Sequence, residues 1–490
     1  MVGVFCSKAK PAIDEDASQR MNSASSPIAS ETARLVALRE ARFKWSLLTS
    51  FLTKPLAVAL PAITVPLFLH YLGPEKYGLY ETVVSLAAWL GLTNLGLGLG
   101  LMNRLTDCFV AEDRGRAQRY TSTLFLATAA LLVLFAVLLL ATVPFIHWRA
   151  LFRTEAQLSH WSLAGLVGLT ASISLLTVFT GNLSPIYSAY QELTRYNLWD
   201  GAGKLLSLAA CFLVVKTPLG LGGVVITATG VPALVRAGNM LHLFLAEKPW
   251  LRPRLALFDW QMLKPIASEG FCFFFLQMAG VAVFNSDKLI LSAFLGPAAV
   301  TDYAITGRVF LTAYGVSMLL LTPLWPAYGE ALRRGDLKWI RRHLRTSLWL
   351  TCGGMVGLGG LLWWRGEALL ALWLGPRAGL SANLVLGMCA AFALRVWVDC
   401  RSVVLNAAGY LRAPMAFWGA QALLNVVLSV VLVRAGGVSG LVWAGPISAG
   451  LTTFWGYPWM TRRFLASHPA AATPGRTAPW SEGPLKPHPS

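Results

Sequence analysis

The chain carries little charge for its length. Charged residues make up 13% of its 490 residues and hydrophobic residues 56%, whereas soluble proteins usually carry about 25% charged residues. So low a charge over a chain this long predicts a membrane protein. The net charge of +18 would suggest a nucleic-acid partner in a soluble protein, but the sequence has no soluble region of any size. We therefore expect no nucleic acid, and we interpret the basic residues as parts of loops that orient the chain in a membrane.

Patterns for metal binding and catalysis are missing as well. The seven cysteines include no C-x-x-C pair, and the seven histidines lack the spacing of metal ligands. Most of the cysteines fall in apolar runs and are interpreted as small buried hydrophobic residues. No nucleophile and base stand together. We expect no metal, no cofactor and no catalytic residue, so the protein is predicted not to be an enzyme.

The N-terminal stretch lacks the compact apolar segment of a signal peptide. Residues 1–45 are polar and mixed in charge, and residues 461–490 are rich in proline. Both compositions are typical of disordered tails. We expect both tails to be disordered and to lie in the cytoplasm.

Long apolar segments dominate the rest of the chain. A spanning helix needs about 20 mostly apolar residues, and twelve segments meet that requirement. The polar stretches between them are short and hold no inserted domain. The sequence therefore predicts an all-α integral membrane protein with spans at residues 46–71, 78–102, 121–147, 161–187, 197–216, 222–245, 266–292, 303–327, 346–364, 382–405, 415–434 and 438–460.

Lysine and arginine are distributed unevenly over the loops. With the N-terminus inside, 27 of the 41 Lys and Arg residues fall in inside segments, 7 in outside segments and 7 within spans. Positive residues concentrate on the cytoplasmic side of membrane proteins. The distribution predicts that both termini are cytoplasmic, and it independently supports an even number of spans.

A Leu-Gly-Pro motif recurs 223 residues later in the chain. A shift of 223 residues aligns residues 72–74 (LGP) with 295–297 (LGP), Tyr80 with Tyr303, and Asp113 with Asp336. Helix pairs can acquire Gly-Pro turns independently, and a third LGP occurs at 374–376, but the joint alignment favours a duplication. Six helices per repeat give two halves of the same orientation, a plan in which substrate binds between the halves.

The predicted domains follow from this repeat. Residues 46–245 form an N-terminal lobe with helices 1–6, and residues 266–460 form a C-terminal lobe with helices 7–12. Residues 246–265 form a cytoplasmic linker between the lobes.

Two segments carry a family resemblance. Residues 71–106 read YLGPEKYGLYETVVSLAAWLGLTNLGLGLGLMNRLT, and residues 284–310 read FNSDKLILSAFLGPAAVTDYAITGRVF. They resemble the polysaccharide-repeat (Wzx-type) flippases of the multidrug/oligosaccharidyl-lipid/polysaccharide exporter superfamily. The resemblance covers about residues 45–460 and implies a MATE-like fold, with two six-helix lobes around a central cavity.

The resemblance also implies a function. Such a protein flips a lipid-diphosphate-linked oligosaccharide from the cytoplasmic to the periplasmic leaflet of the inner membrane by alternating access. The product serves the biosynthesis of surface polysaccharide, either O-antigen or exopolysaccharide. The implied partners are a polyprenyl-diphosphate-linked oligosaccharide, membrane lipids and other polysaccharide-assembly membrane proteins.

Two other functions remain open. A cation-coupled multidrug exporter of the same superfamily would have a mostly apolar site, whereas seven Lys and Arg within spans favour an anionic substrate. A membrane-embedded polysaccharide polymerase or ligase would need a large outside loop, and the outside loops here are short. A channel would need a selectivity filter, and none is visible.

Polar and charged residues inside spans are the candidate site residues, because charges there are costly and usually face a cavity or one another. We expect the sugar head group and its diphosphate to contact Lys54, Gln277, Arg395, Asn406 and Arg308. Lys54 and Gln277 are equivalent in the repeat. The alternative for Lys54 is a side chain that reaches the cytoplasmic interface.

Four carboxylates are candidates for binding a coupling proton or sodium ion: Glu81, Glu269, Asp287 and Asp399. Arg308 is expected to be within reach of Asp287, for which interfacial anchoring is the alternative. Asp399 shares a helix face with Arg395. The alternative for that pair is an ion pair that only neutralises itself.

Glycines and prolines mark places where helices bend or approach closely. Those of the second span predict either a flexible cavity-lining helix or tight packing: Gly91, Gly96, Gly98 and Gly100. Pro323 and Pro326 should break or kink the eighth span near its inner end.

Overall fold

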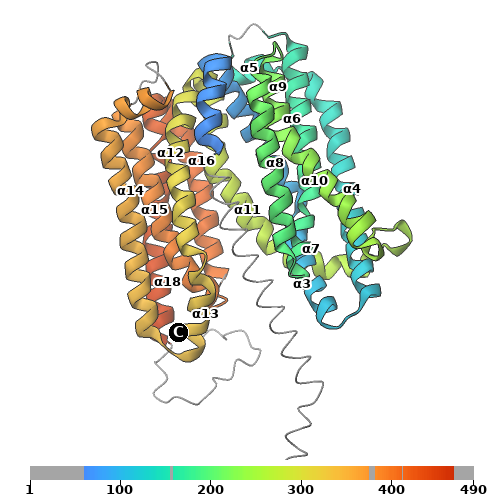
Figure 1. Cartoon of the computed structure of the whole chain (residues 1–490). Helices are drawn as coiled ribbons and strands as arrows, with labels where there is room; N and C mark the ends of the chain where they lie inside the picture. Colours follow the sequence, from blue (N-terminus) through green and yellow to red (C-terminus); the bar gives the residue numbers. More distant parts are fainter. Residues whose placement is uncertain (1–59, 155–157, 375–380, 411, 468–490) are drawn as a thin grey trace, which may run out of the picture.

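The computed structural model describes residues 60–154, 158–374, 381–410 and 412–467. The predicted tail at 1–45 and the first part of the first predicted span lie outside these residues. Within them every regular element is helical. Two helical bundles stand side by side, the N-terminal one in blue to green and the C-terminal one in yellow to red (Figure 1).

The N-terminal bundle begins with helical residues 60–89, in which Gly73 has a φ of 75°. Short segments connect or extend its helices: η1 (Leu90–Asn94), η2 (Val143–Phe145), η3 (Ile226–Gly230) and η4 (Leu243–Glu247). The helices are α3 (Leu97–Val110), α4 (Arg114–Thr142), α5 (Trp148–Phe152), α6 (His160–Gly181), α7 (Leu183–Ala189), α8 (Leu193–Val214), α9 (Gly220–Val225) and α10 (Val231–His242).

The C-terminal bundle begins with a long helix that lies between the two bundles in Figure 1. Its helices are α11 (Trp260–Leu295), α12 (Pro297–Leu321), α13 (Leu324–Arg334), α14 (Leu337–Leu374), α15 (Ala382–Ala407), α16 (Arg412–Leu441), α17 (Ala444–Leu451) and α18 (Thr453–Ser467). The break between α12 and α13 falls beside Pro323, where a proline predicts an interruption.

Eight helical segments in the described part of the chain are long and apolar enough to cross a membrane. They coincide with eight of the predicted spans: 121–147, 161–187, 222–245, 266–292, 303–327, 346–364, 382–405 and 415–434. The protein is therefore a multi-pass membrane protein. The total of twelve spans stays a prediction.

The second predicted span, 78–102, is wrong as a single helix. Helical residues end at 89, η1 follows, and Leu95 (φ 48°) and Gly96 (φ 71°) turn the chain into α3. The cause is a close approach of two backbones. A methyl group built on Gly96 would overlap the carbonyl oxygen of Gly270 in α11, and one built on Gly100 would overlap that of Ile266. Gly96 and Gly100 therefore serve tight packing.

Two predicted boundaries also need correction. α18 continues to Ser467, so residues 461–467 belong to a helix and not to a tail. α11 starts at Trp260, within the predicted linker 246–265, because the Asp259 side chain caps it by accepting from the Gln261 amide at 2.8 Å. Both errors arise because hydropathy detects the apolar middle of a helix and misses its polar ends.

The repeat is visible in local geometry. Gly73 and Gly296, at equivalent positions of the two LGP turns, have φ values of 75° and 85°. Asp113 accepts from the Arg116 amide at 2.8 Å, and Asp336 accepts from the Trp339 amide at 3.0 Å. Each of these three pairs of residues is separated by the same 223 positions. Equivalent glycines thus have a positive φ in both turns, and equivalent residues form the same helix cap in both halves.

The two LGP turns also meet each other. The Thr301 hydroxyl donates to the Pro74 carbonyl oxygen at 2.5 Å. A methyl group built on Gly78, the repeat equivalent of Thr301, would overlap the carbonyl oxygen of Pro297, the equivalent of Pro74. The two bundles therefore touch through reciprocal, equivalent contacts. We call this contact region the turn junction (residues 73–78 and 296–301).

Other bonds reinforce the bundles at the same end. Arg153 donates to the Phe294 carbonyl oxygen at 2.8 Å, and the Trp373 indole donates to the Ala62 carbonyl oxygen at 2.6 Å. Phe294 lies two residues before Gly296, within one helical turn of it. These bonds therefore hold the two bundles together at the end that contains the turns.

Gly78→Ala should destabilise the turn junction. The added methyl group forces the Pro297 backbone away, and overpacking of this kind costs about 1–3 kcal/mol. We expect a lower melting temperature of the purified protein in detergent. Gly280→Ala is the matched control, because a methyl group on this helical glycine of α11 meets nothing within 4 Å. A Gly78→Ala protein that melts no lower than the control would contradict the contact.

Candidate functional site

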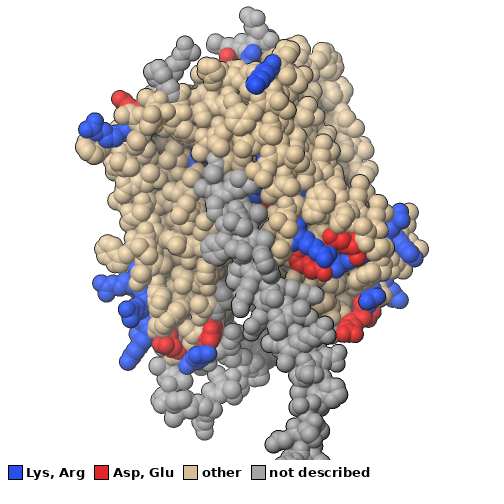
Figure 2. Space-filling view, in the orientation of Figure 1, with Lys and Arg blue, Asp and Glu red and all other residues tan. Residues whose placement is uncertain are grey.

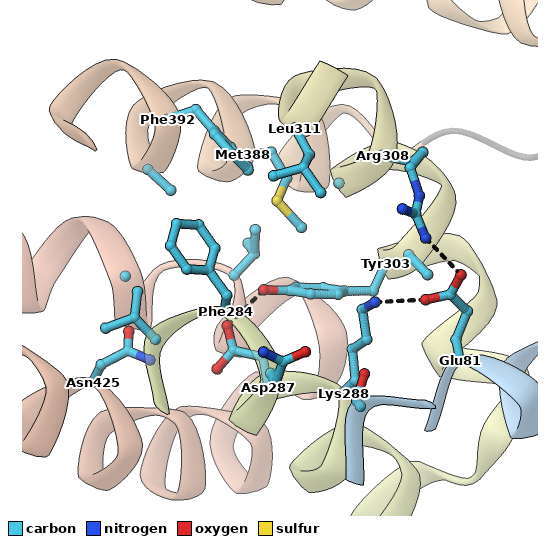
Figure 3. A pocket seen from close by; sticks show the side chains of 18 of the residues that line it. Glu81, Phe284, Asp287, Lys288, Tyr303, Arg308, Leu311, Met388, Phe392 and Asn425 are labelled. Carbon is cyan, nitrogen blue, oxygen red and sulfur yellow. Dashed lines mark hydrogen bonds and ion pairs between the residues drawn. The ribbon is translucent and has the colours of Figure 1, made fainter. Parts of the chain in front are cut away.

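A cavity of ≈ 360 Å³ lies inside the C-terminal bundle and reaches the N-terminal bundle at Glu81. Its walls come from α11, α12, α15, α16 and the start of α17, together with residues 81–88. Apolar side chains such as Phe284, Leu311 and Phe392 form one part of the wall, and charged groups form another (Figure 3). Its size and mixed lining are those of a small-molecule or head-group site.

Glu81 is the most connected of these charged groups. Lys288 of α11 donates to its Oε2 at 2.6 Å, and Arg308 of α12 donates to its Oε1 at 2.9 Å (Figure 3). Tyr77, one turn earlier, donates to Oε1 at 3.0 Å. Glu81 is only 2% exposed. One buried carboxylate of the N-terminal bundle therefore binds two cations of the C-terminal bundle.

The sequence positions explain why these three charges meet. Glu81 lies seven residues after Pro74, and Lys288 lies seven residues before Leu295, so both stand about 10 Å from their turns. Arg308 lies eleven residues into α12 and reaches back with its long side chain. Because the turn junction places the turns together, it also places these side chains together. We call Glu81, Lys288 and Arg308 the inter-bundle triad.

Asp287 has a different environment from the one predicted. It accepts from the Tyr303 hydroxyl at 2.6 Å and from the Ser429 hydroxyl at 2.7 Å. The pairing of Arg308 with Asp287 is wrong, because Arg308 binds Glu81 instead. Among the described residues no Lys or Arg pairs with Asp287, although it is only 6% exposed. Asp287 is thus a buried carboxylate whose bonds come from hydroxyl groups.

Arg395 lines the cavity and forms the predicted pair with Asp399 at 2.9 Å. Its guanidinium stacks over Trp418 at 4.0 Å from the ring centroid. The Tyr314 hydroxyl also donates to Asp399, at 3.0 Å. Asn406 does not line this cavity and instead donates to Ser402 at 3.3 Å. Arg395 and Asp399 therefore satisfy each other at the cavity wall.

The charges around the cavity balance. Its lining contains three cations, Lys288, Arg308 and Arg395, and two carboxylates, Glu81 and Asp287, while Asp399 neutralises Arg395 from behind. With all these groups ionised, the cavity has no excess positive charge. A buried charge needs a partner, and Lys288 and Arg308 both have theirs in Glu81, so an anion that binds these two cations competes with Glu81.

The remaining sequence candidates lie elsewhere. Lys54 is outside the described residues, and Gln277 is exposed on α11 and does not line the cavity. Glu269 is in α11 and Pro326 in α13, but their side chains are not described. Gly91 is exposed in η1, and a methyl group on Gly98 would touch Pro185 of α7 at 3.2 Å.

Sequence reasoning missed a polar face of α16, of which Gln421 and Asn425 line the cavity and Ser429 binds Asp287. Gln421, Asn425 and Ser429 are spaced by four residues along α16 and are 6%, 0% and 0% exposed. Polar residues at i, i+4 and i+8 within the apolar run 415–434 share one helix face, so their spacing was a usable signal. Tyr303 served only as a marker of the repeat, although its hydroxyl binds Asp287.

Comparison with known sequences identifies relatives. The family described as polysaccharide biosynthesis protein matches residues 45–330, more than half of the chain. A Salmonella typhi protein named as a candidate O-antigen transporter is 23% identical over 424 residues, which cover 84% of this chain and 94% of that protein.

Comparison with solved structures confirms the fold class. A multidrug resistance MATE family transporter in an inward-facing conformation superposes with a TM-score of 0.69 at 14% identity, covering 84% of this chain and 95% of that one. The lipid II flippase MurJ, in an inward closed conformation, has a TM-score of 0.62 at 14% identity, covering 85% and 87%. The chain therefore has the predicted all-α, MATE-like fold.

The inter-bundle triad predicts an order of stability among single variants. Glu81→Gln leaves two partly buried cations without their counter-ion. Breaking a fully buried pair costs about 3–5 kcal/mol, so the loss of stability here is at most of that size. Lys288→Met and Arg308→Met each remove one cation and leave Glu81 with the other. We expect Glu81→Gln to lower the melting temperature most. Equal effects of the three substitutions would contradict the central place of Glu81.

Proposed function

Because this chain belongs to the polysaccharide biosynthesis protein family, we propose that it flips a lipid-diphosphate-linked oligosaccharide across the inner membrane by alternating access. The substrate moves from the cytoplasmic to the periplasmic leaflet and serves the synthesis of surface polysaccharide. The observation that carries the proposal is the inter-bundle triad, in which two cations within the membrane share one replaceable carboxylate.

The physical requirement is to carry a diphosphate and sugars through a hydrocarbon layer about 30 Å thick. The lipid tail remains in the bilayer, while the head group needs cations and hydrogen-bond donors. Lys288 and Arg308 supply such donors on one wall of the cavity. A diphosphate carries more negative charge than a single carboxylate, so it competes with Glu81 for these cations.

This competition couples binding to movement. In the structure Glu81 ties the N-terminal bundle to Lys288 and Arg308, next to the turn junction. When the diphosphate takes these two cations, Glu81 loses its partners and the tie between the bundles is broken. The bundles can then separate at the turns. The substrate thereby opens the end through which it leaves.

The orientation that we propose is supported by the distribution of positive charge. With 27 Lys and Arg residues in inside segments and 7 in outside segments, the turn junction faces the periplasm and both termini face the cytoplasm. The structure then represents a state closed toward the periplasm, which receives substrate from the cytoplasm. Other polysaccharide-assembly membrane proteins would supply and consume the lipid-linked sugar.

Asp287 is the site we assign to the coupling cation, a proton or a sodium ion. Glu81 is already bound by two cations, whereas Asp287 has hydroxyl partners and no Lys or Arg among the described residues. Asn425, which is fully buried, lines the same cavity. No resident cofactor and no covalent step form part of the proposal.

A cation-coupled multidrug exporter is the second candidate function. Phe284, Leu311, Met388 and Phe392 give the cavity a substantial apolar wall, which suits a drug. The charged wall and the inter-bundle triad suit an anion better, so we place this function second. A polymerase or ligase has no support in the cavity, whose groups form ion pairs and hydrogen bonds with one another.

Deletion of the gene in its host tests the function. The proposal expects loss of surface polysaccharide and accumulation of lipid-linked repeat units in the cytoplasmic leaflet. Complementation with Lys288→Gln or Arg308→Gln should restore at most about a tenth of wild-type export, since a hydrogen bond to a charged group contributes about 1.5–3 kcal/mol. Arg149→Gln, an exposed arginine of α5, is the control and should restore export fully.

Two outcomes would overturn the proposal. Normal surface polysaccharide in the deletion strain, together with new sensitivity to drugs, would favour the multidrug exporter. Full export by both Lys288→Gln and Arg308→Gln, at wild-type protein levels, would remove the triad from the transport route.

A further inference from the structure

A second concavity lies on the C-terminal bundle. It is a groove of ≈ 600 Å³ between Trp397 of α15 and one face of α18. That face is formed by Phe454, Trp455, Trp459, Arg462 and Arg463, because their spacings of one, four, three and one residues keep to the same side of a helix. We call this feature the α18 groove.

The α18 groove points away from the cavity of the inter-bundle triad. Arg395 of α15 faces the cavity and stacks on Trp418. Trp397 is two residues further along the same helix, which turns its side chain by about 200°. It stacks instead with Phe454 and donates its indole N–H to the Phe454 carbonyl oxygen at 3.2 Å. The groove is therefore separate from the proposed transport route.

The groove is apolar at one end and basic at the other. Phe454, Trp455 and Trp459 are 43%, 53% and 51% exposed, and they precede two exposed arginines in the last turns of α18. From residue 454 to residue 463 the helix rises by about 14 Å. Aromatic rings followed by positive side chains at a helix end are typical of a membrane–water interface.

The arginines in and beside the groove have no acidic partner among the described residues. Arg401 is only 8% exposed, stacks over Trp397 at 3.6 Å and donates to the Trp397 carbonyl oxygen at 2.9 Å. Arg463 lies over Trp459 at 5.5 Å. Within the described residues no Asp or Glu pairs with Arg401, Arg462 or Arg463. The groove is thus complementary to an anion with an apolar body.

More positive charge surrounds the basic end. Leu465 of α18 packs with Leu337 and Ile340, which place the start of α14 at the same end of the bundle. The first turns of α14 expose four further cations, Lys338, Arg341, Arg342 and Arg345. Lys and Arg side chains gather at this lower end of the C-terminal bundle (Figure 2). Such clusters attract the acidic head groups of a membrane leaflet.

We propose that the α18 groove binds an anionic phospholipid. Arg462 and Arg463 hold the phosphate of its head group, Arg401 adds positive charge from behind, and the acyl chains lie along Trp455 and Trp459. The charge distribution selects this occupant over a neutral lipid. A lipid held here anchors α18 and α15 in one leaflet while the other parts of the protein move.

Binding of phosphatidylglycerol and phosphatidylcholine to the full-length protein in detergent tests the proposal, with native mass spectrometry as the readout. We expect saturable binding of phosphatidylglycerol and much weaker binding of phosphatidylcholine. The double variant Arg462→Gln/Arg463→Gln should bind phosphatidylglycerol about tenfold more weakly, which corresponds to about 1.4 kcal/mol. Arg341→Gln/Arg342→Gln removes the same charge at the same end but outside the groove, and should keep most of the affinity.

Three results would overturn the proposal. Equal losses in the two double variants would indicate a diffuse electrostatic attraction. Equal binding of the two phospholipids by the wild type would indicate an aromatic surface without head-group recognition. Tighter binding of a polyprenyl diphosphate, lost in Arg462→Gln/Arg463→Gln, would assign the groove to the transported lipid. If the double variant does not fold, Trp459→Leu keeps every charge and should still weaken phosphatidylglycerol binding.

Discussion

One buried carboxylate holds two cations of the opposite bundle, and much of the molecule follows from that constraint. Lys288 and Arg308 lie within the membrane, where an unpaired charge costs several kcal/mol. Their bonds to Glu81 at 2.6 and 2.9 Å satisfy them, but only while the two bundles are together. The same bonds therefore neutralise the charges of the cavity and close one end of the protein. A change in the charge of the cavity thus affects the closure, and a change in the closure affects the charge balance.

The turns of the two halves are related by the repeat, whereas the charged residues of the candidate site are not. The Gly78 and Thr301 positions are equivalent in the repeat, and they form reciprocal contacts that bring the turns together. The charges do not repeat: the position equivalent to Glu81 is Ala304, and the position equivalent to Lys288 is Val65. The two halves thus share a frame, while both cations lie in one half and their carboxylate lies in the other.

The sequence predicted the helices and turns better than the contacts of the candidate site. Apolar length and the LGP register located eight spans and the turns at Gly73 and Gly296, because both signals are local. The site depends on contacts between helices far apart in sequence. Glu81 and Arg308 are 227 residues apart, and no periodic pattern in the sequence indicates their pairing. The prediction therefore paired Arg308 with the wrong carboxylate, Asp287. The break at Gly96 was missed for the same reason, since its cause is the approach of another backbone.

The central claim is that an anionic head group takes Lys288 and Arg308 from Glu81 and so releases the turn junction. Spin labels at Lys76→Cys and Asp302→Cys, two exposed positions on opposite sides of the junction, measure this directly in a protein whose native cysteines are replaced. Adding a polyprenyl-diphosphate-linked sugar should lengthen the distance between the labels, and the same lipid without its diphosphate should not. An unchanged distance at saturating substrate would contradict the account.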